Sequence, residues 1–127
     1  MNYDYYFFDI EPVAKPRMTQ RDKWANRKVI TNYYAYADEL RFQARSQGLV
    51  LPDYFHVTFF LRMPESWSEK HKDKMRHQPH QLKKRNDRDN LLKSLQDILR
   101  PNDDGMIWGG NVEKRWDYQG SILITIP

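Results

Sequence analysis

The sequence contains no cysteine, and it has no apolar run approaching the ~20 residues that a membrane-spanning helix requires. The lack of cysteine excludes disulfides and thiolate zinc sites, and it is compatible with a reducing compartment. The N-terminus also has neither the basic start nor the apolar stretch that is typical of a signal peptide. We therefore expect a cytoplasmic protein with no membrane partner.

Basic residues are abundant and unevenly distributed along the 127 residues, a length that predicts one domain over 1–127. The net charge is +4, but the stretch from Lys70 to Arg88 holds eight basic and two acidic residues, so the rest of the chain is slightly acidic. A basic segment at about 66–86 favours a polyanionic partner, of which nucleic acid is the commonest. A solvated, mobile loop that keeps the protein soluble is an equally good explanation from composition alone.

Hydrophobic periodicity predicts the main elements. An aromatic-rich stretch predicts a strand at 3–10, and alternating apolar residues predict one at 54–62. Strands at 112–118 and 121–126 are expected to form a β-hairpin joined near residues 119–120. Apolar residues at helical spacing predict helices at 31–47, with Thr31 as the N-cap, and at 89–99. A short helix is expected over 68–76, and residues 11–28 are expected to form a loop or an irregular hairpin. The three histidines of the basic segment are expected at the surface, because no suitably spaced zinc ligands accompany them.

Residues 87–93 (DRDNLLK) are the most informative stretch of the chain. If the leucines of the helix face the core, Asp89 and Lys93 lie together on the opposite, open side. Asp87 directly precedes the helix, and Asp104 follows the turn after it. Asp104 can return to the start of the helix only if the next strand runs back alongside it.

Three acids and a lysine that converge can cut a phosphodiester bond with a metal ion. Carboxylate oxygens are the ligands that Mg²⁺ and Mn²⁺ prefer, and one or two such ions activate a water and stabilise the leaving oxygen. Asp87, Asp89 and Asp104 are the predicted ligands. Lys93 is predicted to neutralise charge on the phosphorane or to orient the attacking water.

A purely structural explanation of the same residues stays open at this point. Asp89 could act only as an N-cap, and residues 103–105 (DDG) could form only a turn. Asp89 and Lys93 are also an i,i+4 pair, which stabilises an exposed helix by only ~0.2–0.5 kcal/mol.

A family resemblance favours the nuclease interpretation. Residues 87–97 (DRDNLLKSLQD), followed by 103–107 (DDGMI), resemble the RusA family of phage and prophage Holliday junction resolvases. Residues 15–19 (KPRMT) and 113–116 (EKRW) also look like phage members, so the resemblance covers nearly the whole chain.

The resemblance implies a fold, a site and a reaction. The implied fold is a small α/β domain of the α+β type, with a mixed sheet flanked by helices. Asp87, Asp89 and Asp104 would be the metal-binding catalytic acids and Lys93 the catalytic lysine. Asp104 is chosen over Asp103 because it is the second acid of the pair. The implied enzyme is a Mg²⁺-dependent homodimer, with Mn²⁺ as a substitute, that makes paired cuts in a four-way DNA junction in a bacterial or phage-infected cell.

Basic residues near the predicted site are candidates for phosphate contacts, which position DNA and give salt-sensitive affinity. The stronger candidates are Lys83, Lys84, Arg85 and Arg88, and the weaker ones are Lys15, Arg17, Arg21, Lys114 and Arg115. Trp116 is expected in the core, whereas Trp24 could pack or stack on a base. The alternatives to a junction resolvase are a non-catalytic DNA-binding module and a nuclease for other branched DNA.

Overall fold

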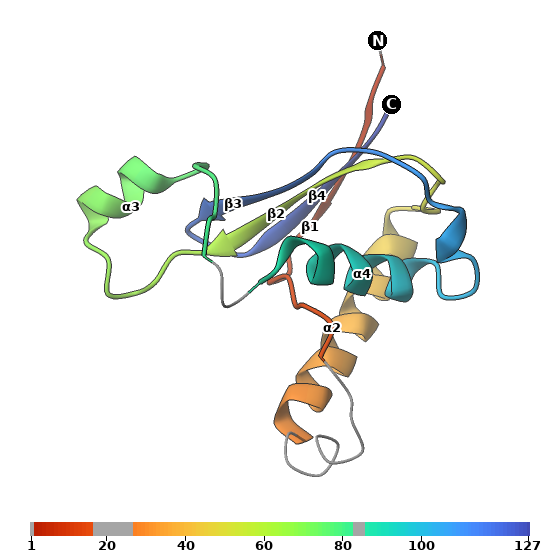
Figure 1. Cartoon of the computed structure of the whole chain (residues 1–127), viewed down its shortest axis with the longest axis horizontal. Coiled ribbons are helices and arrows are strands. Elements are labelled where there is room, and N and C mark those ends of the chain that lie inside the picture. The colour runs from red at the N-terminus through yellow and green to blue at the C-terminus, as the bar shows by residue number, and fades with distance from the viewer. Residues whose placement is uncertain (1, 17–26, 83–85) are drawn as a thin grey trace.

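The computed structural model describes residues 2–16, 27–82 and 86–127 (Figure 1). Several predicted DNA contacts lie outside these residues: Arg17, Arg21, Lys83, Lys84 and Arg85. Trp24 lies outside them as well.

A mixed four-stranded sheet forms the framework of the molecule. Its strands are β1 (Asp4–Phe8), β2 (His56–Arg62), β3 (Val112–Asp117) and β4 (Ser121–Ile126), in the order β1-β4-β2-β3. β2 pairs with β3 in parallel, while β4 is antiparallel to both β1 and β2. With its flanking helices this sheet confirms the predicted small α+β fold.

The predicted hairpin between the last two strands is wrong, because β2 lies between β3 and β4. Val57, Phe59 and Leu61 of β2 are buried, so this apolar strand occupies a central position. β3 carries charged residues at 113–115 and occupies an edge, where charges discourage pairing with another chain. The three residues between β3 and β4 cross the end of β2, a step of roughly 10 Å that a short connection can span.

Two helices cover one face of the sheet (Figure 1). They are α2 (Arg27–Ser46) and α4 (Arg88–Leu99), and both contribute buried residues to one core with the strands. Tyr36 and Leu40 of α2 and Leu91 and Leu95 of α4 are buried in it. The prediction that Thr31 caps the first helix is wrong, because α2 begins four residues earlier, where no proline or glycine interrupts the helix.

A short helix, α3 (Glu69–Met75), projects beyond the ends of β2 and β3 (Figure 1). It buries none of its own residues. His80, after α3, is buried against Trp116, so the prediction that all three histidines of this segment lie at the surface is wrong for His80. Trp116 is buried as predicted.

A 3₁₀ turn, η1 (Asp104–Met106), leads the chain from α4 toward β3. No helix in the described part of the chain is long and apolar enough to span a bilayer.

Candidate active site on helix α4

Asp87 is the N-cap of α4. Its Oδ1 atom accepts hydrogen bonds from the backbone N–H groups of Asp89, at 3.0 Å, and Asn90, at 3.1 Å. Both N–H groups belong to the first helical turn, where they have no partner within the helix. Asp89 therefore belongs to the first turn, and the idea that it is only an N-cap does not hold. The second oxygen of Asp87, Oδ2, accepts no hydrogen bond from the described residues, so it is available to a ligand.

Asp89 and Lys93 lie on the open side of α4, as the helical spacing predicts. The Asp89 side chain is 85% exposed, and Lys93 one turn later is exposed as well. The opposite side of the helix is buried through Leu91, Leu95 and Ile98. The start of α4 thus presents two carboxylates and a lysine to solvent, at the positive end of the helix dipole.

Asp104 contacts Asp97, near the other end of α4. Its carboxylate lies beside that of Asp97, whose Oδ2 is 2.5 Å from Lys15 Nζ. Burial acts to raise the pKa of Asp97, but the hydrogen bond from Lys15 and the nearby positive charges outweigh it and hold the pKa below its usual value. The pKa of Lys15 is raised, mainly by its hydrogen bond to Asp97. These three residues form what is called here the Lys15 clamp.

The structure does not gather the three predicted acids into one metal-binding group. Asp97 lies two turns beyond Asp89, about 12 Å along the helix axis. Asp104 lies beside Asp97 and is therefore distant from the start of the helix. Within residues 2–16, 27–82 and 86–127, no three His, Asp or Glu side chains are close enough to hold one ion. The chain does return to the start of α4, but only at Val112, whose carbonyl accepts a hydrogen bond from Arg88 Nη1 at 3.3 Å.

Asp103, the other candidate for the third ligand, is held elsewhere by Arg100. The Arg100 guanidinium donates from Nε and Nη2 to the two carboxylate oxygens of Asp103, at 3.0 and 2.9 Å. Its Nη1 atom donates to Asp53 at 2.5 Å. The hydrogen bonds from Arg100 are the main reason that the pKa of Asp103 is lowered. Of the two acids, Asp104 is therefore the one that faces α4.

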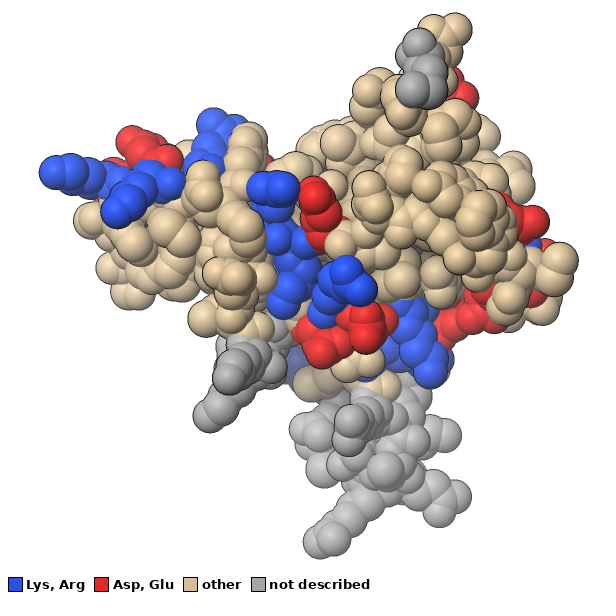
Figure 2. Space-filling view, turned by 45° about the horizontal axis from the view of Figure 1, so that its top comes forward, with Lys and Arg blue, Asp and Glu red and all other residues tan. Residues whose placement is uncertain are grey.

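The DNA-contact candidates within the described residues differ in how strongly their side chains are engaged by other groups of the protein. Arg88 is exposed beside Asp89, with 3.7 Å between Nε and Oδ1. Lys15 is engaged in its clamp, and Arg115 bonds to Glu113 at 3.1 Å and to a backbone carbonyl. Lys114 on β3 is half-buried. Figure 2 shows Asp and Glu side chains lying among Lys and Arg side chains in the middle of one face.

The Lys15 clamp is the part of the site that sequence reasoning missed. Asp97 belongs to the family-like stretch 87–97, and Lys15 opens the family-like stretch 15–19, so both signals were present. Their contact spans 82 positions in sequence, and a pattern read along one helix does not identify such a distant partner. The clamp joins the N-terminal segment to the open side of α4.

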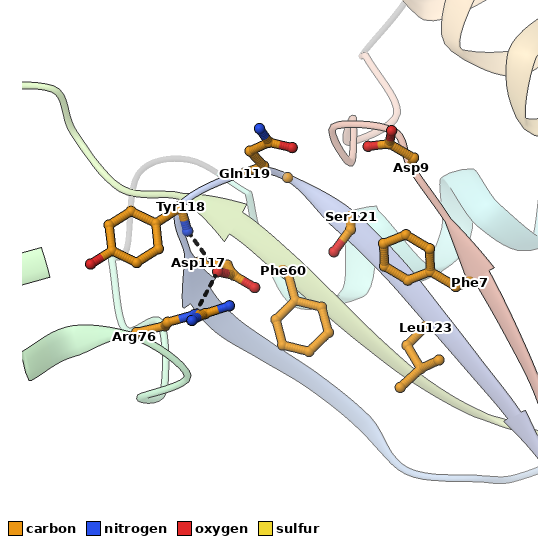
Figure 3. A pocket seen from close by; sticks show the side chains of 10 residues that line it. Phe7, Asp9, Phe60, Arg76, Asp117, Tyr118, Gln119, Ser121 and Leu123 are labelled. Carbon is orange, nitrogen blue, oxygen red and sulfur yellow. Dashed lines mark hydrogen bonds and ion pairs between the residues drawn. The ribbon is translucent and has the colours of Figure 1, made fainter. Parts of the chain in front are cut away.

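A hollow of about 490 Å³ lies away from these residues (Figure 3). Phe7, Phe60 and Leu123 line it, and they alternate with the buried strand residues. The hollow is therefore on the sheet face opposite α2 and α4. None of the predicted catalytic residues lines it.

Comparison with protein families matches residues 9–127 to the model of Endodeoxyribonuclease RusA. A comparison with curated proteins found no match.

Proposed function

Because the chain belongs to the RusA endodeoxyribonuclease family, we propose that it is a metal-dependent nuclease that resolves Holliday junctions by paired cleavage. The family implies endonuclease activity on branched DNA. The observation that carries the proposal for this chain is the start of α4, where Asp87, Asp89 and Lys93 are presented together to solvent.

The two acids at the start of α4 fit a magnesium ion. Mg²⁺ usually keeps several waters and binds through one or two carboxylates together with substrate phosphates. Asp87 has an oxygen that its capping role does not use, and Asp89 is exposed beside it. Mn²⁺ is expected to substitute. A bound ion would supply an activated water and neutralise charge at the phosphate.

The remaining proposed roles belong to side chains along the open face of α4. Lys93 would stabilise the negative charge that develops on the phosphate, or orient the attacking water. Asp104 is kept as the proposed third ligand, and to reach the other two acids its carboxylate would have to leave Asp97. Arg88 would hold the DNA backbone next to the acids.

The proposed active form is a homodimer with two-fold symmetry. A four-way junction approximates that symmetry, and resolving it requires two paired cuts. Two copies of the α4 site, related by the symmetry axis, would place one set of acids on each strand to be cut.

Cleavage of a synthetic four-way junction in Mg²⁺ or Mn²⁺ tests the proposal. Wild type should cut the junction in preference to flap and linear duplex substrates, and Asp89→Asn should bind the junction but cut it about 100-fold more slowly or worse. Metal-independent binding without any cutting would instead identify a non-catalytic DNA-binding module. Faster cutting of flaps than of junctions would indicate a nuclease for other branched DNA.

A further inference from the structure

The basic segment after β2 forms an arm that is held against the sheet by specific contacts. Residues 66–80, here called the α3 arm, leave the sheet after β2 and return to its β3 edge (Figure 1). A helix of seven residues that buries no side chain is not stable alone in water. The chain therefore depends on contacts at the base of the arm to keep α3 in place.

Aromatic stacking and backbone hydrogen bonds form that base. The Trp116 ring lies 4.8 Å from the Trp67 ring and 4.2 Å from the His80 ring, measured between centroids. The backbone of Trp116 bonds in both directions, accepting from His77 N–H at 2.8 Å and donating to the Gln78 carbonyl at 3.0 Å. These contacts continue the pairing of β3 outward, so the arm has a defined position on the sheet edge.

The acids of the arm and its base are occupied by local partners. Asp117 pairs with Arg76 at 3.2 Å, a contact visible in Figure 3, and with His77 at 3.3 Å. Asp73 accepts a hydrogen bond from the Tyr118 hydroxyl. Glu69 lies 3.8 Å from Lys72, which is largely covered.

Two lysines of the arm remain free of such partners. Lys70 and Lys74 are exposed, and no carboxylate of the described residues forms an ion pair with either. They are spaced i,i+4, so they lie on the same side of α3, where two like charges disfavour the helix. A bound anion would relieve that repulsion. Figure 2 shows Lys and Arg side chains on the projecting part of the molecule as well as in the middle of the same face.

We propose that Lys70 and Lys74 of the α3 arm bind the phosphate backbone of a duplex arm of the DNA substrate, away from the point of cleavage. The inference rests on the proposed function, whose substrate has duplex arms that extend beyond the crossover. α3 lies to the left of α4 in Figure 1, and its arm is attached to the β3 edge of the sheet. A junction centred on the acids of α4 would therefore bring a duplex arm, rather than the crossover, toward α3.

Salt-dependent binding of the full chain tests the proposal. Lys70→Gln/Lys74→Gln should bind a junction with arms of about three helical turns at least ~10-fold more weakly near 0.1 M salt, and the slope of log K against log salt should fall by about 2. Lys70→Arg/Lys74→Arg should bind like wild type. Arg41→Gln/Arg45→Gln removes the same charge from α2, near the far end of α4, and should change little.

A junction with arms shorter than one helical turn, about 10 bp, isolates the position of the contact. The loss of affinity should be smaller on it, because a shorter duplex offers fewer phosphates to α3. An equal loss on the short-armed junction, or an unchanged slope on the long-armed one, would overturn the proposal. If wild type binds DNA but cuts no junction, the proposed function fails, while the same comparison on linear duplex still decides whether the α3 arm binds DNA.

Discussion

Substitutions at Asp87 can separate its structural role from its proposed metal-binding role. Its Oδ1 atom caps α4 by accepting two backbone hydrogen bonds, whereas Oδ2 is the oxygen proposed to bind metal. Asparagine keeps an oxygen that can cap the helix but loses the negative charge. Alanine loses both. Asp87→Asn therefore removes only the negative charge, whereas Asp87→Ala removes both the charge and the helix cap.

The expected stability changes follow from the two hydrogen bonds of the cap. Replacing an Asp N-cap by alanine costs about 0.5–2 kcal/mol, and the charge at the positive end of the helix adds about 0.3–1 kcal/mol. We expect Asp87→Ala to lose about 1–2 kcal/mol in the free energy of unfolding. Asp87→Asn should lose less than about 1 kcal/mol, because asparagine caps a helix almost as well as aspartate.

Urea denaturation measures the first effect, and cleavage of a four-way junction measures the second. Both variants should cut about 100-fold more slowly or worse, although their stabilities differ. Asp89→Asn is the matched control, since its exposed carboxylate takes no part in the cap. It should be nearly as stable as wild type and equally deficient in cutting. If Asp87→Asn cut DNA at the wild-type rate, Asp87 would be a cap and nothing more.

Two further predictions concern contacts away from the start of α4. Lys15→Gln and Asp97→Asn should show a coupling of roughly 0.5–1 kcal/mol in a double-mutant cycle by urea denaturation, a modest value because Lys15 is partly exposed to solvent; strictly additive effects would contradict the clamp. Burial is the main reason that the pKa of His80 is lowered from its ordinary value of 6.5. Protonation of His80 therefore favours the unfolded chain, and the free energy of unfolding falls as the pH drops below about 6.5. The urea midpoint of wild type should therefore fall more between pH 7.5 and 5.5 than that of His80→Gln, and parallel pH profiles would show that His80 contributes nothing.

Local pattern predicted the helix of the site well. The leucine stripe identified α4 to within a residue at its start, and the same stripe placed Asp89 and Lys93 on the open side. This works because the 3.6-residue period links burial on one side of a helix to exposure on the other. The two sides of α4 are thus determined by residues within the helix itself.

Contacts between distant segments could not be predicted in the same way. The short connection between the last two strands suggested a hairpin, but strand pairing depends on the whole sheet, and β2 occupies the place beside β4. The contact between Lys15 and Asp97 likewise depends on how the N-terminal segment crosses α4. A turn signal or a charge pattern carries no information about a strand from another part of the chain.

The position of Asp104 follows from its neighbours on both sides. Arg100 holds Asp103 through two hydrogen bonds and also binds Asp53, so the chain is anchored directly before Asp104. The η1 turn then directs Asp104 toward Asp97 at the near end of the helix. Because two turns of α4, about 12 Å, separate Asp97 from Asp89, a change in the Asp104 side chain alone would not reach the start of α4. A third ligand at the start of α4 therefore requires η1 to rearrange as well as the Asp97 contact to open.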